Sequence, residues 1–252
     1  EIMEKATSLA IEQLGLEGKG YKAMFLQGGA SQQFLNVANN FLETKAGYAN
    51  TGTWSTKAIK EAKLLGEVVE LSSSKDANFN YIPKGFDIPS DLDYLHITTN
   101  NTIFGTQYKV LPETNVPLIS DSSSDIFSRS LDFSKFDLLY AGAQKNMGPA
   151  GATLVVAKEA ALGKVSRQVP SMLDYKIQAD KDSMFNTPPV FAVYTSMLTL
   201  EWLKDKGGIA AIEKENDAKA ALMYGEIDRN RLFDGFAATE DRSTMNATFT
   251  LN

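Results

Sequence analysis

The chain has 252 residues, of which 43% are hydrophobic and 22% are charged, and its formal net charge is −6. This composition is typical of an ordinary soluble globular protein, and the length allows one large α/β domain with the start of a second. The acidic charge argues against a nucleic-acid partner. No apolar run reaches the roughly 18 residues that a membrane helix needs, so we expect no membrane partner.

The residue types present also narrow the chemistry that is available. The chain has no cysteine and one histidine, His96. The lack of cysteine excludes disulfides, thiolate metal sites and cysteine nucleophiles. With a single histidine we predict no metal site and no Ser-His-Asp triad. His96 lies inside an apolar strand pattern, where we expect a hydrogen-bonded core histidine. We expect a cytoplasmic location.

In chain order, the first part of the sequence alternates between helical and strand patterns. Apolar residues at helical spacing predict helices over 2–14, around 34–42, and from the turn at 51–55 to residue 65. Short apolar runs predict strands at 23–26, 46–50, 68–71, 94–98, 116–120, 136–140 and 153–157. The polar segment 72–90 is expected to be a loop. Such alternation predicts an α/β fold with a mostly parallel sheet and helices on both faces.

The pattern changes after residue 183. Asn186-Thr187-Pro188-Pro189 is expected to be extended, because a residue before proline disfavours helix. Helices are predicted over 190–206 and 209–229, separated by Gly207-Gly208, and a strand over 246–251. We therefore predict a large domain at 1–206, and a linking helix with the beginning of a small α+β C-terminal domain at 207–252. The sequence starts within a helical pattern and stops after a strand pattern, so we expect missing residues at both ends.

Lys145 is the first candidate for chemistry. It lies between two strand patterns, and no other charged residue occurs from Leu138 to Gly151. Burial at a strand end favours the neutral amine, which is a nucleophile towards carbonyl groups. A lysine on a surface turn is the alternative interpretation.

Asp121 is the second candidate, because it ends the strand pattern that precedes the one leading to Lys145. An acid there can keep a pyridine nitrogen protonated through a charge-assisted hydrogen bond. Aspartate also favours helix N-caps, which is the alternative. Ligands of parallel α/β sheets bind at the carboxyl ends of strands, so the pair together favours a carbonyl cofactor with a ring nitrogen.

Other strand ends carry residues that fit the same kind of ligand. The turn Gly28-Gly29-Ala30-Ser31 opens a helix, whose free backbone amides can bind a phosphate, although small-residue turns before helices are common. Trp54 follows a glycine-containing turn, and it could stack on a flat ring or pack into the core. Thr102 lies in the turn after strand 94–98.

The segment Ala141–Gly151, Ala-Gly-Ala-Gln-Lys-Asn-Met-Gly-Pro-Ala-Gly, closely resembles the lysine motif of phosphoserine aminotransferases. These are class-V members of the fold-type I pyridoxal-phosphate enzymes. The resemblance extends to Asp121–Arg129, Asn100–Gly105, Asn186–Pro189 and Arg242–Asn246, and so it spans nearly the whole chain.

The resemblance implies pyridoxal 5'-phosphate as the cofactor, bound by the large domain. It identifies Lys145 as the Schiff-base lysine and Asp121 as the partner of the pyridine nitrogen. Trp54 would stack on the ring, and Thr102 would contact the ring hydroxyl.

The resemblance also implies how the cofactor phosphate is held. Ala30, Ser31 and Gln144 would contact it, and Asn186 and Thr187 would arrive from the second subunit of a homodimer. The implied reaction transfers an amino group from glutamate to 3-phosphohydroxypyruvate, giving phosphoserine and 2-oxoglutarate in serine biosynthesis. The freed lysine would shuttle a proton between substrate and cofactor.

One position departs from the family pattern. Ser31 stands where some members have an arginine that helps to hold the substrate phosphate, so other basic groups have to supply that contact. The family also places substrate-binding histidine and arginine residues outside the region present here. The alternatives are another class-V aminotransferase, for example of the serine–glyoxylate type, and a non-catalytic protein that binds pyridoxal phosphate or a phosphometabolite.

Overall fold

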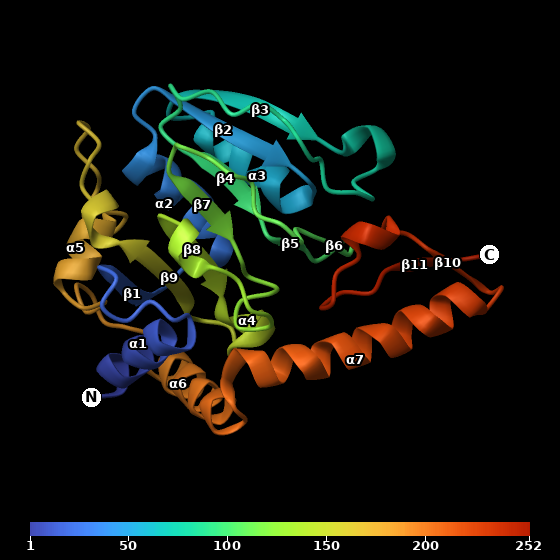
Figure 1. Ribbon diagram of the computed structural model, residues 1–252. Helices are drawn as coiled ribbons and strands as arrows, with labels where there is room; N and C mark the ends of the chain where they lie inside the picture. The colour runs from blue at the N-terminus through green and yellow to red at the C-terminus, as the bar shows by residue number, and fades with distance from the viewer.

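The computed structural model describes residues 1–252, which are built around one seven-stranded sheet (Figure 1). In spatial order, the strands are β1 (Tyr21–Leu26), β9 (Thr153–Lys158), β8 (Leu138–Gly142), β7 (Leu118–Asp121), β4 (Leu95–Thr98), β2 (Lys45–Asn50) and β3 (Glu67–Ser73). Strand β9 is antiparallel to both of its neighbours, and all other neighbouring pairs are parallel. The sheet confirms the expected mostly parallel α/β fold.

Helices cover both faces of the sheet because the central strands are apolar on both sides. The helices are α1 (Ile2–Gln13), α2 (Gly29–Phe41), α3 (Thr53–Ala62), α4 (Ala143–Asn146), α5 (Tyr175–Asp180), α6 (Val190–Asp205) and α7 (Gly208–Arg229). Residues of α1 and α6, which lie side by side in Figure 1, form one core with alternate strand residues. Residues of α2, α3 and α5 form a second core against the other strand residues.

Several boundaries differ from those that the sequence predicts. The apolar run 136–140 forms a strand only from Leu138, and pairing with β9 extends that strand to Gly142. Strand β3 continues to Ser73, so the first two residues of the expected loop 72–90 belong to the sheet. The helix expected to reach residue 65 ends as α3 at Ala62, and the strand expected over 246–251 is β11 (Phe249–Leu251).

The sequence patterns also leave out some short elements. Two small hairpins form, β5 (Asn100–Asn101) with β6 (Thr106–Gln107), and β10 (Phe233–Gly235) with β11. Four short 3₁₀ helices are η1 (Lys75–Ala77), η2 (Phe133–Lys135), η3 (Glu159–Ala161) and η4 (Thr239–Asp241). None of the helices is both long and apolar enough to cross a membrane.

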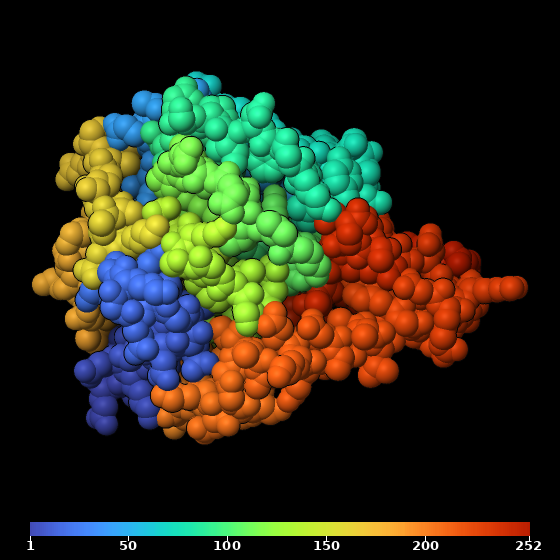
Figure 2. Space-filling model, viewed as in Figure 1, coloured from blue at the N-terminus to red at the C-terminus, as the bar shows by residue number.

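The C-terminal region is connected to the sheet by two consecutive helices. Gly207 and Gly208 have φ values of 100° and 75°, which glycine adopts readily, and the chain breaks here between α6 and α7, with Gly207 as the N-cap and Gly208 as the first residue of α7. Helix α7 leads away from the sheet to β10 and β11, and Figure 2 shows this segment projecting beyond the rest of the molecule. The division into domains at residue 206 stays a prediction.

Candidate active site

The carboxyl ends of β7 and β8 bring an acid and an amine to the same edge of the sheet. Asp121 is the last residue of β7, and it pairs in register with Tyr140 of the neighbouring strand β8. Strand β8 ends at Gly142, and the one-turn helix α4 that follows carries Lys145. Because β7 and β8 are adjacent and parallel, the two candidate residues lie at neighbouring strand ends.

The loop that carries Lys145 is closed at its base. Gly142 pairs with Thr153 across β8 and β9, and the amide of Ala143 donates to the carbonyl oxygen of Ala152 at 3.0 Å. The antiparallel direction of β9 makes this closure possible, because the chain turns back beside the strand it has just left.

The amine of Lys145 lies among polar and aromatic groups of other elements. Its Nζ donates to Oγ1 of Thr102 at 2.7 Å and lies 5.5 Å from the centroid of the Trp54 ring. Burial lowers the pKa of Lys145, and the charges of Asp121 and Asp125 oppose that shift. The residue as a whole is nevertheless exposed to solvent. A partly desolvated, accessible amine is suited to react with a carbonyl group.

Asp121 differs from Lys145 in being buried, with 4% of its surface exposed. Burial raises the pKa of its carboxyl group, while hydrogen bonding from Ser123 and the charge of Lys145 oppose this. Oδ1 accepts a hydrogen bond of 3.0 Å from the Ser123 amide, and no protein donor reaches Oδ2. A buried carboxylate with one free oxygen fits a protonated ring nitrogen, so the residues present fit pyridoxal phosphate at this point.

Thr102 is held in place by the hairpin β5–β6, whose connecting turn carries it. Asn100 donates to Ser124 at 2.8 Å and to Asn246 at 2.7 Å, and it accepts from Ser243 at 2.5 Å. Ser243 and Asn246 of the C-terminal segment therefore hold the β5–β6 hairpin through Asn100.

Trp54 lies in the first turn of α3, close to the same hairpin. A Cβ atom on Gly52, the residue that caps α3, would lie 3.0 Å from Oδ1 of Asn101 and 3.1 Å from the Phe104 ring. The missing side chain therefore allows α3 and the hairpin to approach closely. This contact brings the indole ring near Thr102 and Lys145.

Ala30 and Ser31 lie in the first turn of α2. Gly28 and Gly29 precede them with φ values of 93° and 67°, and no side chain caps the helix. The amides of that turn are thus available for a phosphate. Helix α2 packs against β8, the strand that leads to Gln144 and Lys145, and Gln144 folds back over Gly142.

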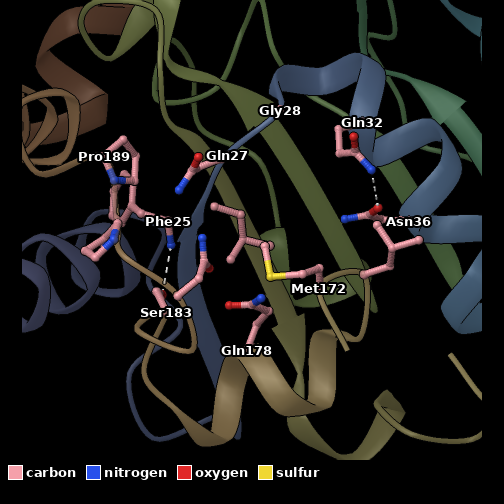
Figure 3. A pocket seen from close by; sticks show the side chains of 13 residues that line it. Phe25, Gln27, Gly28, Gln32, Asn36, Met172, Gln178, Ser183 and Pro189 are labelled. Atoms are coloured by element: carbon pink, nitrogen blue, oxygen red, sulfur yellow. Dashed lines mark hydrogen bonds between the residues drawn. The ribbon is translucent and has the colours of Figure 1, made fainter. Parts of the chain in front are cut away.

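Asn186 and Thr187 lie elsewhere, beside the edge strand β1. Gln27 donates to the carbonyl oxygen of Thr187 at 2.8 Å. A cavity of about 190 Å³ lies at this position, lined by residues that include Gln27, Gln178 and Asn186. Figure 3 shows this cavity from close by, with Gln27 and Gln178 labelled. Neither Lys145 nor Asp121 lines it. The structure therefore brings together Lys145, Thr102, Trp54 and Asp121, but not Asn186 and Thr187 of the same chain.

His96 belongs to the core, as expected. It is 1% exposed, its Nε2 is hydrogen-bonded to the Tyr140 hydroxyl at 2.9 Å, and its ring stacks on Tyr48. Burial lowers its pKa to about 3, so it is neutral. The Nδ1 atom has no partner.

Two features of the segment after Asp121 are not anticipated by the sequence patterns. Asp125 and Arg129 form a buried ion pair of 2.9 Å, and Arg129 also donates to the carbonyl oxygen of Tyr108 at 2.6 Å. Ser123 contacts both Asp121 and Gly142. The spacing of four residues between Asp125 and Arg129 is the one signal that could have indicated the ion pair.

Comparison with known proteins gives concordant results. The model of the class-V aminotransferase family matches residues 2–252. Phosphoserine aminotransferase of Flavobacterium johnsoniae is 64% identical over the whole chain, which covers 71% of that protein.

Two solved structures extend this similarity to the fold. A phosphoserine aminotransferase structure concerned with radiation damage of the Schiff base matches with 46% identity and a TM-score of 0.97, covering 100% of this chain and 71% of the other. Phosphoserine aminotransferase from Trichomonas vaginalis with bound PLP matches with 33% identity and a TM-score of 0.93, covering 100% of this chain and 72% of the other.

Proposed function

Because the chain belongs to the class-V aminotransferases, and within them to the phosphoserine aminotransferases, we propose that it performs transamination in serine biosynthesis. Its cofactor is pyridoxal phosphate. The reaction exchanges an amino group between the pair O-phospho-L-serine and 3-phosphohydroxypyruvate and the pair glutamate and 2-oxoglutarate. The observation that carries the proposal is that Asp121 and Lys145, at the carboxyl ends of β7 and β8, are grouped with Thr102 of the β5–β6 turn and Trp54 of α3.

Each of these side chains has a role that follows from its chemistry. Lys145 would hold the cofactor covalently through Nζ, and Asp121 would hold the ring nitrogen through its free oxygen. Trp54 would cover a face of the ring, and Thr102 would contact the ring hydroxyl, as its present bond to Lys145 suggests. When bound, pyridoxal phosphate withdraws electrons from the α-carbon of the substrate.

The phosphate of the cofactor would lie at the first turn of α2. The backbone amides there and the helix dipole favour an anion; Ala30 and Ser31 lie in that turn, and Gln144, in the segment after β8, would contribute from the other side. None of these three residues is charged, so the helix terminus itself would supply most of the attraction.

Lys145 is also the group that would move the proton during the reaction. Its pKa is lowered by burial, so Nζ gives up a proton more readily than an exposed lysine does and can accept one from the substrate α-carbon. Asp121 makes no direct bond to the amine, and the charge of Lys145 and the hydrogen bond from Ser123 favour its ionised form against the effect of burial, so that it could hold a protonated ring nitrogen.

We test the cofactor assignment by replacing the amine. Lys145→Ala should abolish the absorbance band that arises from the covalent link between the cofactor and Nζ, and with it the transamination of phosphoserine. Lys57 is the matched control, because its amine also lies over the Trp54 ring, at 4.6 Å, but on the exposed surface of α3. Lys57→Ala should retain both signals, and a Lys145→Ala chain with wild-type absorbance and turnover would contradict the proposal.

The substrate is tested separately, because Ser31 replaces an arginine of some family members. Turnover of phosphoserine but not of serine, with 2-oxoglutarate as the acceptor, is expected. Equal turnover of both amino acids would favour the alternative of a class-V aminotransferase for unphosphorylated substrates.

We further propose that the protein is a homodimer in which Asn186 and Thr187 serve the site of the second copy. Their position beside β1, two strands away from β8, supports this role. Mixing Lys145→Ala with Asn186→Ala chains should restore activity that neither variant has alone, since a hybrid dimer would contain one intact site. No restoration on mixing would contradict shared sites. The cytoplasmic location stays a prediction.

A further inference from the structure

Three consecutive buried serines follow Asp121, and their side chains contact different parts of the molecule. The Ser122 hydroxyl is hydrogen-bonded to Ser120 at 2.7 Å, within the same segment. The Ser124 hydroxyl donates to the carbonyl oxygen of Asn100 at 2.9 Å, in the hairpin. The Ser123 hydroxyl accepts from the amide of Gly142 at 3.1 Å. Ser123 is thus the one serine of the three whose side chain contacts the segment that carries the amine.

The Ser123–Gly142 hydrogen bond lies beyond the last backbone hydrogen bond between the chain segments of β7 and β8. The final backbone bond runs from the Ser122 amide to the carbonyl oxygen of Tyr140, at 2.9 Å. Gly142 is two residues further along β8 and is the N-cap of α4. The Ser123 hydroxyl therefore links the segment after β7 to the start of α4, at a point where no backbone hydrogen bond joins them.

Ser123 also contacts the acid. Its amide donates to Oδ1 of Asp121 at 3.0 Å, and its proximity lowers the pKa of that carboxyl group against the larger effect of burial. Ser123 is 2% exposed, so water does not compete effectively for these bonds. A single buried residue therefore contacts both the carboxylate and the residue at the start of α4.

We propose that Ser123 is a positioning residue that fixes the Asp121 carboxylate and the start of α4, with Lys145, in one relative arrangement. This inference rests on the proposed function, because the arrangement matters for a ligand that has to meet both groups. Ser123 itself would not touch the reacting atoms. It acts through the direction of the carboxylate and through the backbone position of Gly142.

The test compares three variants of the full chain loaded with pyridoxal phosphate. Ser123→Ala removes the acceptor of the Gly142 amide, and Ser122→Ala is the control, because it removes a neighbouring buried hydroxyl that contacts neither Gly142 nor Asp121. Ser123→Thr keeps a hydroxyl at the same position. The measurements are the dissociation constant of pyridoxal phosphate, by equilibrium dialysis, and the pH at which the absorbance of the bound cofactor is lost on acidification.

We expect Ser123→Ala to weaken cofactor binding about tenfold or more, which is about 1.4 kcal/mol. The acid limit of binding should move to higher pH, because the Ser123 amide, no longer held through the link to Gly142, bonds the ionised carboxylate less well. Ser122→Ala should stay within about twofold of the wild type, and Ser123→Thr should recover most of the affinity. A residue with only a structural role would change stability without moving the acid limit.

The inference is overturned if Ser123→Ala binds and titrates like Ser122→Ala while the wild-type chain binds pyridoxal phosphate. If Ser123→Ala does not fold, Ser123→Cys takes its place, since a thiol is a weaker acceptor of similar shape. A wild-type chain that binds no pyridoxal phosphate would instead overturn the proposed function, and this inference with it.

Discussion

The buried ion pair of Asp125 and Arg129 leads to a strong prediction about stability. Arg129 donates from Nε and Nη2 to Oδ2 of Asp125, at 3.2 and 2.9 Å, and Asp125 also accepts from Thr99 at 2.5 Å. Arg129 is 8% exposed and Asp125 is 3% exposed. Replacing Arg129 with methionine preserves much of the side-chain volume but leaves the carboxylate buried without its cation.

The expected loss in the free energy of unfolding depends on whether one or both partners of the ion pair are replaced. Removing one partner of a buried ion pair costs about 3–5 kcal/mol, because the remaining charge is left without compensation. The whole free energy of unfolding of a protein is about 5–15 kcal/mol, so Arg129→Met should remove a large fraction of it. The variant Asp125→Asn combined with Arg129→Met should recover part of the loss, since no uncompensated charge remains.

The assay is urea unfolding followed by circular dichroism at pH 7. The matched control is Lys176→Met, which breaks a pair at the same i, i+4 spacing with Asp180 on the surface of α5, where the two side chains are 50% and 56% exposed. That change should cost about 0.5 kcal/mol or less. The reasoning is refuted if the two substitutions lower the free energy of unfolding by similar amounts.

Three further predictions concern other parts of the molecule. Acidification from pH 6.5 to 3 should cost up to about 1.4 kcal/mol per pH unit through His96, because the unfolded histidine binds a proton that the folded one, with a pKa of about 3, does not. His96→Asn should flatten this slope in urea unfolding at several pH values, and an unchanged slope would contradict the assignment. Gly28→Ala should lower the free energy of unfolding by about 1–3 kcal/mol and weaken cofactor binding. The reason is that φ of Gly28 is 93° and the new Cβ would lie 2.5 Å from Cβ of Gln32. Gly225→Ala, in an open part of α7, should instead stabilise the chain by up to about 1 kcal/mol, and equal effects in thermal unfolding would count against the argument. Ser243→Ala should lower the free energy of unfolding by about 1–3 kcal/mol and weaken the binding of pyridoxal phosphate, because the hairpin loses a hydrogen bond at Asn100. Wild-type affinity in equilibrium dialysis would show that this hydrogen bond does not affect cofactor binding.

The sequence predicts the pairing of Asp121 with Lys145 because both follow apolar strands that are consecutive in the chain. Consecutive parallel strands usually lie side by side, and β7 and β8 do. The direction of β9 could not be predicted, since the run 153–157 is apolar apart from Thr153 and would look much the same in either direction. The contact between Lys145 and Thr102 depends on how the hairpin β5–β6 packs, and residues of that hairpin are held by Asn246, which is far away in the sequence.

The roles of individual polar residues were harder to predict than the elements that carry them. Ser122, Ser123 and Ser124 are identical in type and lie next to one another, but their contacts differ because each points to another neighbour. Local patterns carry no information about such directions. The glycine at position 52 is similar, because the sequence indicates a turn there, while the close approach of the hairpin appears only in three dimensions.

The closed base of the loop from Gly142 to Thr153 limits the ways in which the amine of Lys145 can travel. With both ends of the loop tied together, the backbone acts as a fixed pivot. Rotation about the four side-chain bonds of the lysine is then the most direct way to displace the amine. Its reach from this anchor is set by the length of the lysine side chain.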